Sequence, residues 1–157
     1  MWWNAGTDLL PGVVAADGET TRVLIALVCI ARGALDAAHD IVGSLDSAEA
    51  IYAHAMIHRR EGKAKGEAGL SGYSNARYWF SRLGDHPLFD QIAEFAAAHP
   101  GAPRAMKSGA TWDPAAFVQH CEASERSGSS ENLAFCTAVQ QTEWELLFDW
   151  CAKLTAA

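Results

Sequence analysis

Apolar residues recur at helical spacing from Thr20 almost to the end of the chain, in segments that stop at Gly or Pro. No segment alternates apolar and polar residues as a half-buried strand does. Capping signals support two of the helix starts, Asp46-Ser47-Ala48-Glu49 and Asp113-Pro114. The sequence therefore predicts an all-α fold of about seven helices, the last of them long. The expected helices span 20–32, 36–42, 48–61, 74–83, 88–98, 114–126 and 131–154.

The composition is that of a globular domain. Half of the 157 residues are hydrophobic and 20% are charged, which excludes a disordered, collagenous or disulfide-scaffold chain. A chain of this length fits a single helical domain spanning 1–157. Residues 1–19 contain turn-forming pairs without a sustained period, so we expect a lead-in segment there. Residues 62–72 hold four Gly and are expected to form an inserted surface loop.

Charge and cysteine usage restrict the partners and the compartment. Nineteen acidic residues outnumber twelve basic ones, and a net charge of −7 would repel nucleic acid and anionic membranes. The N-terminus lacks a secretory pattern, and the longest apolar run, Val23–Ala31, is too short to cross a bilayer. The four cysteines form no C-x-x-C pair and lie among apolar neighbours, as buried, reduced thiols do. These features predict a cytoplasmic protein without nucleic-acid or membrane partners.

Two of the expected helical hairpins share a plan. In each, a helix ends near Gly, a large residue begins the next helix, and a small Ala follows where the two helices cross. The first unit is Ile30–Ala38, and the second is His58–Gly62 continued by Gly72–Ala76. This spacing is similar to that of tetratricopeptide-type repeats, in which small residues permit close antiparallel packing. The second unit is interrupted by about ten residues, so we expect two degenerate repeats with helical caps.

One polar constellation is placed to carry chemistry. His54, His58 and Glu61 fall at i, i+4 and i+7 on the expected helix 48–61, so two imidazoles and a carboxylate lie on one face. Such a set suits a divalent metal such as zinc, or an acid/base pair in which Glu61 orients a histidine. Alternatively, the histidines are hydrogen-bonding groups of a packed core. The helix is apolar nearly all round, so buried polar groups on it would be costly unless they are satisfied.

The next expected helix supplies possible partners for this face. Asn75, Trp79 and Arg82 share one face of it, and Arg82 could neutralise Glu61. An anion, a carboxylate or a peptide could then be held by guanidinium groups, for which the candidates are Arg59, Arg60 and Arg82. His86 follows where the chain leaves this helix. His39 shares a face with Leu35 and Val42 of the expected helix 36–42 and is interpreted as a core residue.

Several stretches together resemble a family of uncharacterised bacterial and fungal helical proteins. They are His54–Gly62 (HAMIHRREG), Tyr73–Arg82 (YSNARYWFSR), Asp85–Pro87, Trp112–Pro114 with Phe117-Val118, and Trp144–Cys151 (WELLFDWC). In that family the H-R-R-E-G segment runs almost directly into Y-x-N-A, which makes 63–71 an insertion here. The resemblance implies no activity, but it marks the positions that match the motif. These are His54, His58, Arg59, Arg60, Glu61, Asn75, Trp79, Arg82 and His86.

The sequence thus predicts a domain that binds a small ligand or protein segment through a His/Glu/Asn/Arg pocket. The first alternative is an enzyme in which His58 is a base or metal ligand, Glu61 orients it or completes the coordination, and Arg82 stabilises a developing negative charge. The second alternative is a structural or oligomerisation module, possible as a homo-oligomer, that uses Trp2, Trp3 and the Trp-rich C-terminal helix as its contact surface.

Overall fold

The computed structural model describes residues 18–64, 69–107 and 111–157, and all of the regular elements within these ranges are helical. The predicted all-α class, with seven α-helices and a long helix at the C-terminus, is confirmed. Most of the predicted lead-in segment lies outside the described residues. The elements are α1 (Glu19–Ala31), α2 (Leu35–Val42), α3 (Ala48–Glu61), α4 (Gly72–Leu83), α5 (Phe89–Ala98), the short 3-10 helix η2 (Arg104–Met106), α6 (Pro114–Ser127) and α7 (Ser130–Ala156).

Side-chain caps begin four of these helices. The side chains of Ser47, Ser71, Asp113 and Ser129 each accept a hydrogen bond from the backbone N–H three residues further on. This satisfies one of the donors that a helix N-terminus leaves free. Two of the caps, at Ser47 and Asp113, lie where the sequence predicts them, and Pro114 occupies the first turn of α6.

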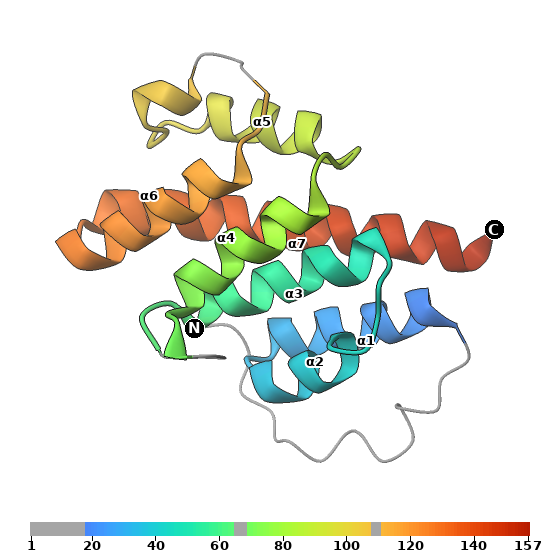
Figure 1. Ribbon diagram of the computed structural model, residues 1–157. Coiled ribbons are helices and arrows are strands. Elements are labelled where there is room, and N and C mark those ends of the chain that lie inside the picture. Colours follow the sequence, from blue (N-terminus) through green and yellow to red (C-terminus); the bar gives the residue numbers. More distant parts are fainter. Residues whose placement is uncertain (1–17, 65–68, 108–110) are drawn as a thin grey trace.

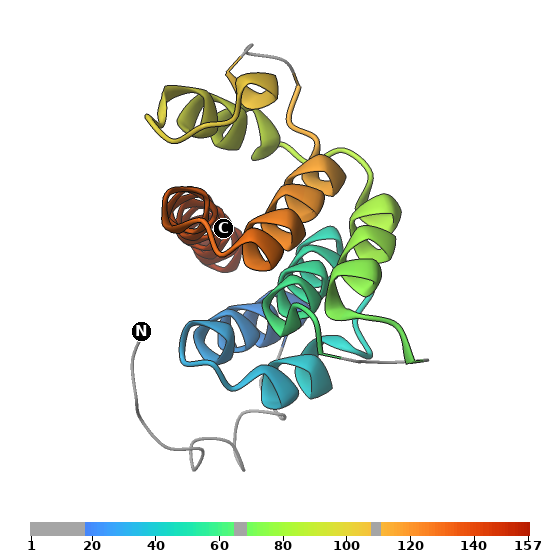
Figure 2. The same ribbon diagram turned by 90° about the vertical axis from the view of Figure 1, so that its left-hand side faces the viewer.

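The long helix α7 organises the molecule. It runs the length of the fold, with α5 above it and the hairpin of α1 and α2 below it (Figure 1), and it contacts α1, α5 and α6. A view nearly along α7 shows α5 and the α1–α2 hairpin on opposite sides of it (Figure 2). Helix α3 packs against α1, α2 and α4. It is therefore enclosed by other helices.

The burial of α3 agrees with the pattern predicted for it. Every residue from Tyr52 to Arg59 is buried, including His54, His58 and the guanidinium-bearing Arg59. A helix buried on all sides cannot turn its polar residues to water, so each polar group must find a partner or a cavity. The two cavities described below are formed around these residues.

A close approach between α3 and α4 fixes where α4 lies. A side-chain carbon added at Gly72 would lie 2.3 Å from the carbonyl oxygen of His58 and 2.7 Å from Cβ of Glu61, so only glycine fits there. The loop between the helices is closed by two backbone hydrogen bonds, Gly72 N–H to Ala64 and Tyr73 N–H to Gly62. The first turn of α4 therefore rests directly on the last turn of α3.

The four cysteines are free and buried, as the sequence predicts. Across the described helices, no stretch combines the length and the apolar character needed to cross a membrane.

Candidate metal centre

The imidazoles of His39, His54 and His58 meet between α2 and α3. One ring nitrogen from each lies within 4.8 Å of the others. The Nε2 atoms of His39 and His54 are 3.0 Å apart, and the rings of His54 and His58 stack with centroids 4.9 Å apart. Two helices thus bring three imidazole rings together.

Glu61 orients His58. Nδ1 of His58 donates a hydrogen bond of 2.7 Å to Oε2 of Glu61, one helical turn further along α3. With Nδ1 carrying the proton, the lone pair of the imidazole is on Nε2, and that atom is buried without a hydrogen-bond partner. A carboxylate that holds the outer nitrogen of a histidine is the usual second contact of a histidine metal ligand.

His54 is held by α4. Its ring stacks on Trp79 at a centroid distance of 3.8 Å, and the guanidinium of Arg82 lies 5.0 Å from the Trp79 ring. Burial, helped by the nearby His39, His58 and Arg82, lowers the pKa of His54 to about 3. The imidazole is therefore neutral at pH 7, which is the form that binds a metal.

A cavity of about 270 Å³ opens onto this cluster. It is lined by His39 and His58 together with three carboxylates, Asp36, Asp40 and Glu61, and no Lys or Arg is among its lining residues. Three acidic groups around one opening create a negative potential that concentrates cations. The cavity therefore favours a cation, whereas the arginines in the sequence suggest an anion.

The Nε2 atoms of His39 and His54 lie near the separation that two ligands of a small transition metal ion have. Zn–N bonds of about 2.0–2.1 Å at tetrahedral angles place ligand nitrogens about 3.3 Å apart. The separation of 3.0 Å between His39 and His54 is close to this value. Three protein ligands leave a coordination position free, as in catalytic zinc sites.

The nine residues singled out in the sequence do not form a single pocket. Five of them lie at or beside the histidine cluster: His54, His58, Glu61, Trp79 and Arg82. Arg82 contacts the Trp79 ring and, within the described ranges, forms no ion pair with Glu61. Asn75 is buried in α4, and its Nδ2 has no hydrogen-bond partner.

The remaining candidates lie elsewhere. His86 is buried against the rings of Tyr52 and Trp150, away from the cluster. Arg59 forms an ion pair with Glu143 of α7, and Arg60 lines a different cavity.

Sequence reasoning missed His39 as a potential metal ligand. The signal that could have found it is its position on the core-facing side of the helix 36–42, since a histidine turned inward needs a polar partner. The sequence also places Glu61 among the possible ligands, whereas in the structure Glu61 contacts His58 and His39 completes the set.

The tryptophans predicted as a contact surface are partly used within the fold. Nε1 of Trp144 donates to the carbonyl of Leu27 and Nε1 of Trp150 donates to Glu49. Trp2 and Trp3 lie outside the described residues. The indoles of Trp144 and Trp150 therefore tie the long helix to α1 and α3.

Comparison of the chain with protein-family models, with curated proteins and with solved structures gives no match in any of the three. The family resemblance described above stays a prediction.

Proposed function

We propose that this protein binds a divalent transition metal ion of the zinc type through the Nε2 atoms of His39, His54 and His58. The observation that carries the proposal is the convergence of one ring nitrogen from each of three histidines within 4.8 Å, in a cluster where Nε2 of His58 is buried and has no partner among the described residues. A buried, unpaired imidazole nitrogen is costly, and a metal ion would satisfy it together with its two neighbours.

The donor set argues for a transition metal. Imidazole nitrogens suit zinc, copper, nickel and iron, whereas calcium and magnesium prefer oxygen ligands. The carboxylates of Asp36, Asp40 and Glu61 surround the opening, where they attract the ion and balance its charge. Of these, Glu61 also holds His58 in the tautomer that binds a metal.

A metal-dependent enzyme is the second candidate function. It is favoured by the open cavity, since three protein ligands leave a position at which a water or a substrate would bind. A small ligand or protein segment, as predicted from the sequence, would approach through the same opening. The tetratricopeptide-like plan and the cytoplasmic location stay predictions, and four free, buried thiols are consistent with a reducing compartment.

Metal titration of the apoprotein tests the proposal. We expect saturable binding of one Zn²⁺ per chain by calorimetry, and visible absorption bands of four- or five-coordinate Co²⁺ when cobalt replaces it. His39→Gln, His54→Gln and His58→Gln should each reduce the affinity by a factor of a hundred or more, because each removes one of three ligands (about 2.7 kcal/mol or more).

The matched control is His99→Gln, because this histidine lies at the end of α5 and contacts Gly101 and Phe135. It should retain wild-type metal binding. Circular dichroism and urea unfolding establish that each variant is folded. Equal metal binding by the three cluster variants and the control, or no saturable binding by the folded wild type, would contradict the proposal.

A further inference from the structure

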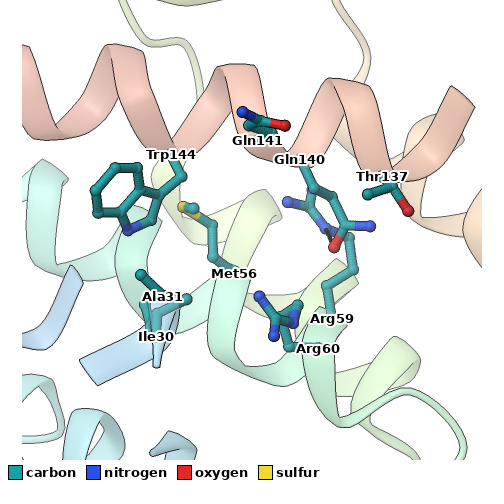
Figure 3. Close-up of a pocket in the computed structure, with 9 residues that line it drawn as sticks. All are labelled: Ile30, Ala31, Met56, Arg59, Arg60, Thr137, Gln140, Gln141 and Trp144. Atoms are coloured by element: carbon teal, nitrogen blue, oxygen red, sulfur yellow. Dashed lines mark hydrogen bonds between the residues drawn. The ribbon is translucent and has the colours of Figure 1, made fainter. Parts of the chain in front are cut away.

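A second and larger cavity lies on the opposite face of α3. Its volume is about 480 Å³, within the usual range of small-molecule pockets, and α1, α3 and α7 form its walls (Figure 3). Helical spacing explains the separation from the histidines. Met56, Arg59 and Arg60 project from one side of α3, while His54 and His58 project from the other.

The two ends of this cavity differ in chemistry. One end is apolar and consists of Ile30, Ala31, Met56 and Trp144. The other end carries hydrogen-bonding groups and positive charge, from Arg59, Arg60, Thr137, Gln140 and Gln141 (Figure 3). Such a division matches a ligand with an apolar body and a polar head.

The charge at the polar end is unbalanced. Among the described residues no carboxylate lines the cavity, although the whole chain has a net charge of −7. Arg59 already has a counter-ion, because its Nη2 donates to Glu143 and its Nε donates to Gln140. The exposed Arg60 has neither a hydrogen bond nor an ion pair within the part of the chain that the structure describes. A guanidinium without a counter-ion thus faces the cavity next to one that is neutralised.

The surrounding side chains are held in place. Nε1 of Trp144 donates a hydrogen bond of 2.7 Å to the carbonyl of Leu27, which fixes the indole as an apolar wall. Gln140 accepts from Arg59 and donates to the carbonyl of Cys136 at 3.2 Å. A cavity whose walls are already ordered loses little entropy when a ligand enters.

We propose that this cavity binds an amphipathic organic anion. Its carboxylate pairs with Arg60 at the polar end, and its hydrocarbon body packs against Met56, Ile30 and Trp144 at the apolar end. A planar guanidinium matches a carboxylate with two parallel hydrogen bonds, which a neutral head group cannot replace. The site is independent of the metal proposal, since it shares no lining residue with the histidine cavity.

Octanoate is a suitable probe, with octan-1-ol as its uncharged analogue. In calorimetry and in an NMR titration of the metal-free protein, octanoate should bind saturably, and octan-1-ol should bind about tenfold more weakly. Arg60→Gln should weaken octanoate binding by about tenfold and leave octan-1-ol binding unchanged, while Arg60→Lys should restore part of the loss. Arg126→Gln is the matched control, because Arg126 is exposed on α6 and distant from the lining residues.

Further variants exclude other binding sites. Ala31→Phe places a ring at the apolar end and should reduce the binding of both probes, which locates them in this cavity. His58→Gln should leave octanoate binding unchanged. Equal affinity for octanoate and octan-1-ol, an unaltered affinity in Arg60→Gln, or a loss confined to His58→Gln would each overturn the proposal.

Discussion

The two cavities on either side of α3 differ in charge and in the residues that supply it. The histidine cavity has three carboxylates and two imidazoles in its lining and no arginine, whereas the larger cavity has two arginines and no carboxylate. His58 lines the first cavity, and the next two residues, Arg59 and Arg60, line the second, because successive residues point in different directions around a helix. One helix therefore presents acidic surroundings on one face and basic surroundings on the other.

A buried polar network lies beside the larger cavity, whose lining includes Arg59. Tyr52 donates a hydrogen bond of 2.9 Å to Oε1 of Glu143, and the other carboxylate oxygen is paired with Arg59. Burial and the Glu143 carboxylate raise the pKa of Tyr52 well above its usual value, so its hydroxyl remains a donor. The guanidinium of Arg59 also lies 5.0 Å from the Phe117 ring. This network ties α3 to α7 and α6 on the side of the larger cavity.

Removing Glu143, the centre of this network, should have the largest effect on the free energy of unfolding. Glu143→Ala leaves the buried charge of Arg59 without a counter-ion, so we expect a loss of about 3–5 kcal/mol in the free energy of unfolding, measured with urea. Glu145→Ala is the control, since that residue is exposed on the same helix and should change stability by less than about 0.5 kcal/mol. Similar losses in both variants would show that the network does not hold α3 on α7.

Displacing α4 should weaken metal binding at the histidine cluster and leave octanoate binding in the larger cavity unchanged. Gly72→Ala forces a methyl group against the carbonyl of His58. We expect the free energy of unfolding to fall by an amount near the upper end of about 1–3 kcal/mol. The displaced helix carries Trp79, so Zn²⁺ affinity should fall, while octanoate binding between α1, α3 and α7 should persist. Calorimetry with both probes measures this difference, with Gly101→Ala as the control. A parallel loss of both ligands would remove the distinction between the cavities.

Changing the carboxylate behind His58 should weaken the metal site alone. Glu61→Gln keeps the size of the side chain but removes the charge that orients Nδ1 of His58. We expect Zn²⁺ affinity to fall by about 10- to 100-fold, with octanoate affinity unchanged. Glu94→Gln on the exposed side of α5 is the control and should alter neither. An unchanged Zn²⁺ affinity in Glu61→Gln would mean that the carboxylate does not support the metal ligands.

The smallest effect is expected for Arg82, which the sequence predicts as a possible counter-ion of Glu61. Arg82 is exposed and contacts the Trp79 ring, so Arg82→Gln should lower the free energy of unfolding by only about 0.5 kcal/mol. Neither probe should lose more than about threefold in affinity, because this arginine lines neither cavity. A tenfold loss of octanoate affinity would place the anion site beside α4 instead of at Arg60.

Helical periodicity and capping chemistry made much of the fold predictable. The start of α3 follows from Ser47, whose hydroxyl caps the backbone N–H of Ala50, and the burial of its middle, from Tyr52 to Arg59, follows from apolar residues on every face. The shared face of His54, His58 and Glu61 is also a local property of one helix. These features depend on residues that are close together in the sequence, so a single sequence contains them.

The contacts that polar side chains make with residues of other helices were not predictable in the same way. His39 reaches His54 only because the short helix α2 docks beside α3, and Glu143 pairs with Arg59 across 84 positions of the chain. Nothing local distinguishes Arg59, which has a buried counter-ion, from Arg60, which has none among the residues that the structure describes. Such pairings depend on how helices cross and on which side chains that crossing brings within hydrogen-bond distance.

In this protein, local sequence is enough to predict the helices, two of their four side-chain caps and the direction in which each polar residue of α3 points. Helix packing decides which of those residues share a cavity, that His39 joins His54 and His58, and that Arg59 and Arg60 line a different cavity. The physical reason is one of range. Backbone hydrogen bonds and helical periodicity act over a few residues, whereas cavities and buried ion pairs arise only when distant helices pack against one another.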